Sequence, residues 1–270
     1  MYVVKVPGIN GLGKTQGCEG AGNAVLAELR NLYTNEEGKE INADKIDLEE
    51  IHLDNFNIEA TKELIYKNSF EDFGTKPKIV FIGGDHSISF SLTHAFLDYC
   101  QNLGKEPCLI VFDAHPDCMK PIDKNAPTHE EWLSALVEKG FPSENILLVG
   151  IRNSWKTEIE FLKKKGIKTI LMDNFLENFE NTCHIIMEFA NGRELYVSLD
   201  IDVVDPVFAP STGHPEVGGL SSRQILYLVK KINKIKSLKA VDLVEINSKK
   251  DIEKDNVTVK LGAKIVGELI

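Results

Sequence analysis

Cys108-Leu-Ile-Val-Phe-Asp-Ala-His-Pro-Asp117 is the segment that says most about the fold of this chain. Its first five residues are apolar and predict a buried strand, and the polar residues after them mark where that strand ends. The same arrangement returns at Leu195-Tyr-Val-Ser-Leu-Asp-Ile-Asp202, and where Lys78-Ile-Val-Phe-Ile82 leads into Gly83-Gly-Asp-His-Ser87. Because sites in parallel α/β sheets lie beyond the carboxyl ends of the strands, we expect these three blocks to share one site.

Strand-like and helix-like segments alternate along the rest of the chain. Strands are predicted near residues 2–6, 45–48, 78–82, 108–113, 146–151, 168–172, 195–200 and 240–245. Helices are predicted near residues 20–33, 58–68, 87–103, 129–140, 157–165, 175–190, 221–235 and 257–268. This alternation predicts βαβ units, and therefore an α/β fold of three αβα layers with a mostly parallel sheet of about eight strands. No linker or repeat interrupts it, so we expect a single domain over residues 1–270.

Composition and charge narrow the classes of function. The chain of 270 residues is 43% hydrophobic and 27% charged, which is ordinary for a globular protein. A formal net charge of −10 argues against nucleic acid and anionic membranes as main partners. The sequence contains neither an apolar run of membrane-spanning length nor a signal-peptide pattern. Its five cysteines are scattered and lack a C-x-x-C pair, so we expect a reducing cytoplasm.

Acidic and histidine side chains at every second position indicate a metal site. Asp113, His115 and Asp117 alternate in this way, and so do Asp200 and Asp202. At the period of a strand, each set can point the same way. A single aspartate at a strand end is often only a turn former, but two such clusters and a third block are hard to assign to turns. Carboxylates gathered in an apolar interior repel one another, so we predict two metal ions that share carboxylates.

Together, these blocks resemble the motifs of the ureohydrolase family, which contains arginases, agmatinases and formiminoglutamases. G-G-D-H-S at 83–87, D-A-H-x-D at 113–117 and S-x-D-x-D-x-x-D-P at 198–206 stand in the order of that family. The loop at 211–220 is close to its T-G-x-P-x-x-G-G-L, and residues 241–247 look like its D-x-x-E-x-N strand. The resemblance runs along most of the chain and implies the arginase-like form of the three-layer fold.

The resemblance also implies which side chains hold the ions. One ion would be held by His86, Asp113, Asp117 and Asp200, and the other by Asp113, His115, Asp200 and Asp202. Two divalent ions would lower the pKa of a water that they share. Because the donor set is rich in oxygen, we expect two Mn²⁺ per chain, with iron, cobalt and nickel left open. Asp85 either orients a ligand or caps the helix that begins near residue 87.

Three further residues are candidates for contact with a substrate. In the family, the position of Glu245 grips a guanidinium, which a carboxylate suits; the alternative is a surface or salt-bridged glutamate. His129 is placed like the proton-shuttle histidine of the family, although the usual H-G neighbour is missing; the alternative is polar surface at the start of a helix. His214, in the T-G-H-P turn, is expected at the mouth of the pocket.

Three residues depart from the arginase pattern. Met119 stands where arginases usually carry an asparagine, and no Ser-Gly-Asn turn follows it. Asn153 and Trp155 stand where arginases carry acidic residues. Without these polar groups the site is poorly suited to arginine, so we expect agmatine or another guanidine that lacks the α-carboxylate. Met119 and Trp155 are therefore candidate contacts with the substrate.

We therefore expect a hydrolase with two metal ions that removes the guanidino group from a small, linear, cationic substrate and releases urea. His129 and Glu245 would be its catalytic residues, and agmatinase would be its nearest relative in function. Arginase and formiminoglutamase remain the alternatives within the family. A metal-dependent deacetylase would use one zinc ion and a pair of adjacent histidines, which this sequence lacks. A non-catalytic homologue would have little reason to keep six costly ligands. By analogy with relatives, we expect a homo-oligomer, either a trimer or a hexamer.

Overall fold

A parallel sheet runs through the computed structural model, which describes residues 2–270 and leaves Met1 outside the described part. Within residues 2–270 it has eight strands, and every pairing between them is parallel. The strands are β1 (Tyr2–Val6), β2 (Asp47–Glu50), β3 (Ile79–Gly83), β4 (Pro107–Phe112), β5 (Ile146–Ile151), β6 (Lys168–Leu171), β7 (Glu194–Asp200) and β8 (Leu238–Val244). Their order across the sheet is β2-β1-β3-β8-β7-β4-β5-β6. The expected fold class is confirmed.

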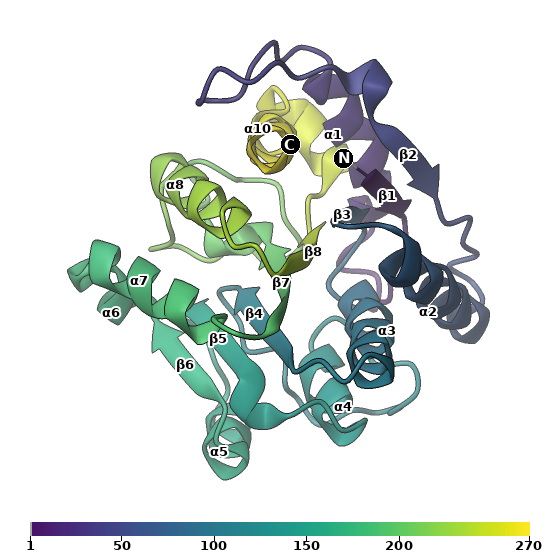
Figure 1. Ribbon diagram of the computed structural model, residues 1–270, viewed down its shortest axis with the longest axis vertical. Helices are drawn as coiled ribbons and strands as arrows, with labels where there is room; N and C mark the ends of the chain where they lie inside the picture. Colours follow the sequence, from purple (N-terminus) through teal and green to yellow (C-terminus); the bar gives the residue numbers. More distant parts are fainter. Residues whose placement is uncertain (1) are drawn as a thin grey trace.

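Helices cover both faces of the sheet, which gives the three layers (Figure 1). The helices are α1 (Ala21–Leu29), α2 (Ile58–Thr75), α3 (Ile88–Asn102), α4 (Trp132–Glu138), α5 (Lys156–Lys165), α6 (Met172–Glu177), α7 (Phe179–Phe189), α8 (Ser222–Asn233), α9 (Ser248–Asp251) and α10 (Val257–Leu269). Alternate strand residues face opposite layers, as the period of a strand requires. Val3 and Val80 pack in the core under α1, α6, α7, α8 and α10. Val4 and Phe81 pack in the core under α2, α3, α4 and α5.

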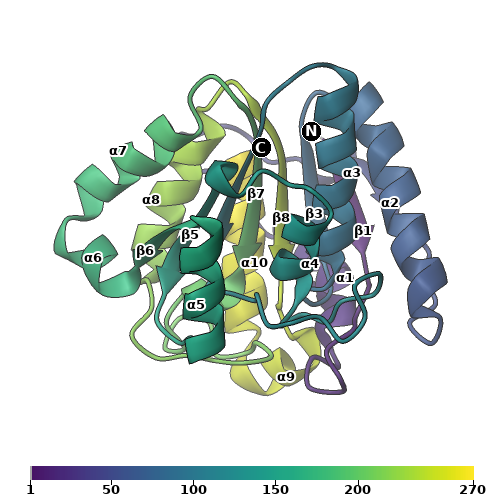
Figure 2. The ribbon, with the colours of Figure 1, turned by 90° about the horizontal axis from the view of Figure 1, so that it is seen from below.

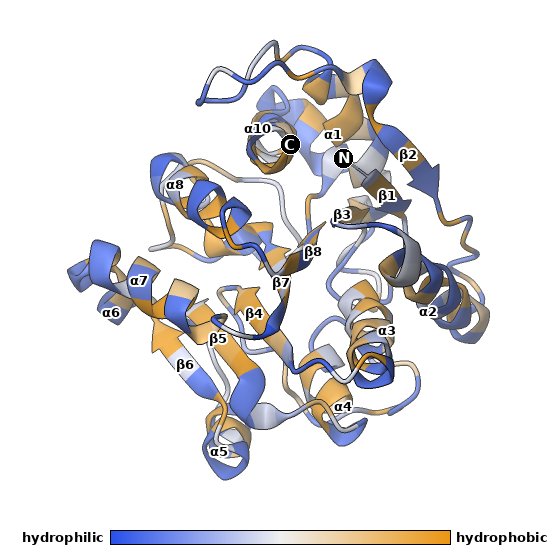
Figure 3. Cartoon of the chain, in the orientation of Figure 1, coloured by the Kyte–Doolittle hydropathy of each residue, from blue (hydrophilic) through white to orange (hydrophobic). Residues whose placement is uncertain are grey.

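The apolar residues are concentrated where the layers meet (Figure 3). The central strands are buried on both faces and are therefore almost wholly apolar, whereas the edge strand β2 reads Asp-Leu-Glu-Glu and is largely exposed. The helices carry polar side chains on their outer faces. No helix between residues 2 and 270 is long and apolar enough to cross a membrane.

Three of the predicted helices differ from those observed. The helix predicted at 58–68 continues as α2 to Thr75. The segment predicted as a helix at 129–140 becomes helical only at Trp132, because the side chain of Glu131 folds back and accepts a hydrogen bond from the backbone N of Thr128 at 3.1 Å. The helix predicted at 175–190 is two helices, α6 and α7, separated by Asn178 with φ −142° and ψ 64°. Asparagine readily leaves helical geometry, and here it allows Phe175 and Phe179 to stack with ring centroids 5.3 Å apart.

The strand order brings the three motif blocks to one place. The chain passes from β3 through α3 to β4, and the gap between these strands is filled later by β7 and β8. Four neighbouring central strands, β3, β8, β7 and β4, therefore end side by side, each followed by a polar segment. The loop after β1 and helix α9 lie at this same edge, the lower one in Figure 2. A parallel sheet places its site at this edge, where the order of the strands reverses.

Candidate metal centre

His86 lies among three carboxylates. Its ring is fully buried, and Nδ1 lies 2.9 Å from Asp117, 3.1 Å from Asp113 and 3.3 Å from Asp200. Within residues 2–270, however, neither this Nδ1 nor Oδ2 of Asp113 has a hydrogen-bond partner of acceptable geometry. Buried polar atoms in proteins are almost always partnered. Oδ2 of Asp117 accepts a hydrogen bond from Nε1 of Trp132 at 3.1 Å, which holds that carboxylate in place. A ring nitrogen and three carboxylate oxygens that converge in this way fit the ligand shell of a metal ion.

A chain of buried hydrogen bonds behind His86 sets the direction of its ring. The hydroxyl of Ser198 donates to Asp242 at 2.7 Å, and its oxygen lies 2.9 Å from Nε2 of His86. Asp242 also accepts hydrogen bonds from Ser89 at 2.9 Å and from Tyr196 at 2.8 Å. Because the proton of Ser198 is directed at Asp242, the serine oxygen accepts from Nε2–H. Nδ1 is then left with its lone pair facing the carboxylates, as a metal ligand requires.

A second group of candidate ligands adjoins the first. Nδ1 of His115 lies 2.9 Å from Asp202 and 3.6 Å from Asp113. The other carboxylate oxygen of Asp202 accepts a hydrogen bond from the backbone N of Ala114 at 2.9 Å, which holds Asp202 in place. In each group, His86–Asp113–Asp117 and Asp113–His115–Asp202, the ligand atoms all lie within 4.8 Å of one another. Asp113 belongs to both groups, as expected of a bridging residue.

Turns, and not the alternation of a strand, bring these side chains together. β4 ends at Phe112, and Asp117 has a left-handed backbone with φ +49°. Asp202 lies in the short 3-10 helix Ile201–Val203, and its backbone N donates to Asp200 at 2.7 Å. The expected geometry was wrong here, for a simple reason. On an extended strand, Asp113 and Asp117 would be roughly 13 Å apart, too far to reach one ion.

Burial and mutual repulsion change how these groups titrate. Burial, reinforced by the charge of Asp113, raises the pKa of Asp117 to about 7. Burial likewise raises the pKa values of Asp200 and Asp202. Burial alone would lower the pKa of His115, but hydrogen bonds to Asp113 and Asp202 raise it to about 12. Protons and cations therefore compete for the same ligands.

Glu245 presents a buried carboxylate beside the two groups. It follows β8 with φ +65°, and its backbone N donates to the carbonyl of Gly84 at 2.9 Å. One carboxylate oxygen accepts a hydrogen bond from the backbone N of His86 at 2.9 Å, and the other lies 3.8 Å from Sγ of Cys18. Burial and the nearby charge of Asp85 raise the pKa of Glu245 well above its usual range. A cation at this position would favour the ionised carboxylate and so oppose both causes of the shift.

Asp85 anchors a loop, and it also accepts a hydrogen bond at the start of α3, as expected of a capping residue. One of its oxygens accepts hydrogen bonds from the backbone N of Asn10 and the hydroxyl of Thr15, both at 2.7 Å. The other accepts from the backbone N of Ser87 at 3.1 Å. These bonds fix the loop at residues 7–17, which carries Lys14 to the site.

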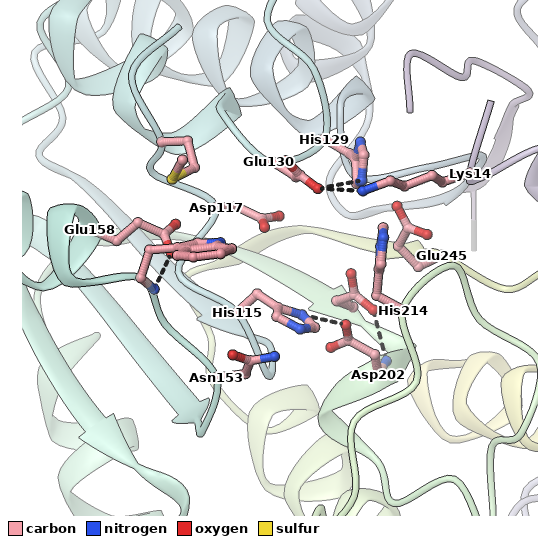
Figure 4. A pocket seen from close by; sticks show the side chains of 13 residues that line it. Lys14, His115, Asp117, His129, Glu130, Asn153, Glu158, Asp202, His214 and Glu245 are labelled. Carbon is pink, nitrogen blue, oxygen red and sulfur yellow. Dashed lines mark hydrogen bonds and ion pairs between the residues drawn. The ribbon is translucent and has the colours of Figure 1, made fainter. Parts of the chain in front are cut away.

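A pocket of about 220 Å³ opens above the candidate ligands (Figure 4). It is lined by Lys14, His115, Asp117, Met119, His129, Glu130, Asn153, Trp155, Glu158, Asp200, Asp202, His214 and Glu245. All five predicted substrate contacts are in this lining, although Trp155 is 71% exposed and stands at the rim. Lys14, Glu130 and Glu158 were not predicted. They belong to loops and to a helix start, where no local pattern marks a pocket residue.

His129 lines the upper part of the pocket in the view of Figure 4. Its ring is 4% exposed, and neither ring nitrogen has a hydrogen-bond partner within residues 2–270. Nε2 lies 3.7 Å from the carboxylate of Glu130. Burial lowers the pKa of His129 below that of an ordinary histidine, which favours the neutral form of the ring.

Known proteins are similar to this chain in sequence and in structure. Residues 2–270 match the family model described as "Arginase family". "Arginase 1, mitochondrial" from Oryza sativa subsp. indica is 32% identical over 204 residues, or 75% of this chain. The match spans only 57% of that relative, little more than half its length.

Solved structures are also similar to this chain. The structure of proclavaminate amidino hydrolase from Streptomyces clavuligerus has a TM-score of 0.86 at 25% identity, covering 99% of this chain and 89% of that one. A hypothetical agmatinase from Burkholderia thailandensis has a TM-score of 0.82 at 27% identity, covering 99% and 84% respectively.

Proposed function

From the premise that this chain belongs to the arginase family, we propose that it is a hydrolase that uses two divalent ions to release urea from a small guanidino compound. The observation that carries this proposal is the position of Asp113, which belongs to both groups of candidate ligands. When bound, the ions would supply a water activated for attack on the guanidinium carbon. We propose Mn²⁺ for both positions, because four carboxylates outnumber two imidazoles in the donor set. Asp200 would be the second shared ligand.

Glu245 is proposed to bind the guanidinium. Its carboxylate is 3% exposed and is held by the backbone of His86, so its direction is set before a substrate arrives. A planar guanidinium offers donors in a fork that matches the two oxygens of a carboxylate. The positive charge also offsets the repulsion between Glu245 and its acidic neighbours. This pairing would aim the guanidinium carbon at the ligand groups below.

His129 is proposed to pass a proton to the leaving amine. The ring lines the pocket, and burial favours its neutral form, which can accept a proton. Histidine is the side chain that most often transfers protons in general acid–base catalysis. Glu130, 3.7 Å away, would stabilise the ring while it carries the extra proton.

Agmatine is the substrate that we propose, and arginine is the second candidate. Met119 lines the pocket and Trp155 its rim, where neither offers a charged partner to an α-carboxylate. Lys14 is the observation that favours arginine, because a lysine in the lining can meet a carboxylate. That lysine is already 3.3 Å from Glu130, so much of its charge is offset.

Steady-state kinetics on agmatine and arginine, with Mn²⁺ supplied, test the proposal. We expect kcat/KM to be about tenfold or more higher for agmatine, since a lost polar contact is worth roughly 1–3 kcal/mol. Equal or better use of arginine would contradict the substrate choice and leave the hydrolase proposal standing. If neither compound nor any other guanidine in a panel released urea, the hydrolase proposal itself would be wrong.

The control is Asp113→Ala, which removes the ligand common to both groups. Elemental analysis should find that this variant has lost most of both ions, and urea release should fall to background. His115→Ala should weaken the binding of one ion and leave the binding of the other unchanged, because His115 belongs to one group only. Two full equivalents of metal in Asp113→Ala would show that the ligands have been misassigned.

A further inference from the structure

We propose that His129, Glu130 and His214 form a third cation site at the mouth of the pocket, with a preference for Zn²⁺ over Mn²⁺. One ligand atom from each residue lies within 4.8 Å of the other two. This group shares no residue with the two acidic groups below it. Figure 4 shows the three side chains together on the side of the pocket that also holds Lys14.

To hold one ion, the ring of His214 would have to turn, because the two imidazoles are stacked and the lone pair of a ring nitrogen lies in the plane of its ring. The rings of His129 and His214 are parallel to within 8°, with centroids 5.2 Å apart, and Nε2 of His129 is 3.7 Å from Glu130. Ligand atoms around one tetrahedral Zn²⁺ are roughly 3.3–3.5 Å apart, given bonds of about 2.0–2.2 Å. Glu130 and His214 are both partly exposed, so they can move by the distance required.

The ring of His129 provides an independent indication of a ligand. It is 4% exposed, and both of its nitrogens are buried without a hydrogen-bond partner among residues 2–270. Leaving two buried polar atoms unpaired is costly, and few such atoms remain in folded proteins. An ion bound by Nε2 would satisfy one of them. The T-G-H-P turn supplies the second imidazole, a position for which the family motif prescribes no residue type.

The donor set explains the preference for zinc. Two imidazoles and one carboxylate are a common set of protein ligands for Zn²⁺ when one coordination position is left open. The two groups below are dominated by carboxylates, which suit Mn²⁺. The same pocket would therefore hold two kinds of site, and Zn²⁺ at low concentration would enter the upper one without displacing Mn²⁺.

Lys14 opposes this ion. Its Nζ lies 3.3 Å from Glu130, on the carboxylate that the ion requires. The side chain of Lys14 is 57% exposed, so it can swing into solvent when a cation arrives. An ion bound here would also occupy His129 and cover the entrance, so Zn²⁺ would inhibit urea release. This last consequence, unlike the site itself, rests on the proposed function.

Zinc titration of the full chain already loaded with two Mn²⁺ tests the site. Calorimetry should find one added Zn²⁺ per chain, and elemental analysis should find both Mn²⁺ retained. His214→Ala should weaken this binding by about tenfold or more, the size of effect that even indirect metal contacts have. Lys14→Gln should tighten it several-fold. The two variants change affinity in opposite directions, so a general loss of folding cannot imitate the pattern.

Two results would overturn the site: Zn²⁺ that binds only as Mn²⁺ leaves, or affinity that neither variant changes. Urea release without added zinc is measured in parallel. If the third ion binds as expected while no guanidine is hydrolysed, the proposed function fails and the site stands. If a guanidine is hydrolysed and neither variant changes the zinc affinity, the proposed site is wrong and the proposed function stands.

Discussion

At the scale of single residues, the direction of His86 depends on a carboxylate that does not touch the pocket. Asp242 is fully buried and accepts hydrogen bonds from three hydroxyls, those of Ser89, Tyr196 and Ser198. Of these three residues, only Ser198 also contacts His86, at Nε2, and so links Asp242 to the imidazole ring. Asp242 is therefore a positioning residue for the metal centre.

Asp242→Asn should weaken the binding of one Mn²⁺ by about 10–100-fold, the usual effect of losing a residue that orients a metal ligand. An amide has one acceptor oxygen where the carboxylate has two, so the hydroxyl of Ser198 is free to turn toward His86 and change its tautomer. Metal titration followed by calorimetry measures the affinity of each ion. The affinity of the ion held by His115 should change little.

Tyr196→Phe is the matched control. It removes one hydrogen bond from Asp242 at 2.8 Å but leaves Ser198 in place. The variant should lose about 0.5–1.5 kcal/mol of stability, the net value of one hydrogen bond, and keep its metal affinity. If both variants lowered metal affinity equally, the effect would be general loosening of the core and not the direction of His86.

At the scale of elements, the loop between β7 and α8 packs against the segment that follows β8. An added Cβ on Gly213 would lie 2.6 Å from a carboxylate oxygen of Glu245 and 3.2 Å from Thr15. A glycine is therefore required at this position by close approach, and the loop determines how much room Glu245 has.

Gly213→Ala should raise KM for the guanidino substrate and lower kcat/KM by about tenfold or more, since displacement of a substrate-positioning group by about 1 Å can cost a hundredfold. Two bound Mn²⁺ should remain, because the atoms nearest an added Cβ on Gly213 belong to Glu245 and Thr15, neither of which is assigned to the Mn²⁺. Kinetics and elemental analysis on the same preparation check both statements. Gly74→Ala is the control, since an added Cβ there meets nothing within 4 Å. A variant of Gly213 with unchanged KM would place the guanidinium elsewhere.

At the scale of the whole molecule, the acidic site opposes folding unless cations fill it. Burial raises the pKa of Asp117 to about 7 and that of Asp72, remote in sequence and on α2, to about 6. Between pH of about 4 and 7, the folded chain therefore holds protons that the unfolded chain has released. Stability falls as pH rises through this window, because the folded state must then bury the charges.

The metal-free protein should consequently melt at a lower temperature near pH 7 than near pH 5. Added Mn²⁺ should reverse this order, because metal binding releases protons and strengthens as the ligands lose them. Thermal melts at both pH values, with chelator and with Mn²⁺, give the four melting temperatures that are compared. Asp72→Asn removes the part of the pH dependence that Asp72 causes and that is unrelated to metal. The increase in melting temperature on adding Mn²⁺ should therefore remain in this variant. An increase in melting temperature on adding Mn²⁺ that was the same at both pH values would contradict the assignment of these aspartates as metal ligands.

The layered architecture and the candidate ligand blocks could both be predicted from the sequence. Strands and helices can be predicted from the spacing of apolar residues, which is a local property of the sequence. Each predicted strand overlaps an observed one. The blocks at 83–87, 113–117 and 200–202 were expected to converge, since the carboxyl ends of parallel strands meet at one edge. The family motifs added residues such as Glu245, whose chemical role remains a proposal.

Only the tertiary structure decided how the ligands meet and what surrounds them. The turn at Asp117 and the short helix at Asp202 replace the strand geometry that the alternation suggested. Lys14 reaches the pocket because Asp85, 70 residues from Thr15 in the chain, holds its loop by hydrogen bonds. Loop conformation depends on such distant partners, and no periodicity in the loop itself encodes them. The pairing of His129 with His214, and the cation site proposed there, follow from the same contacts between distant loops.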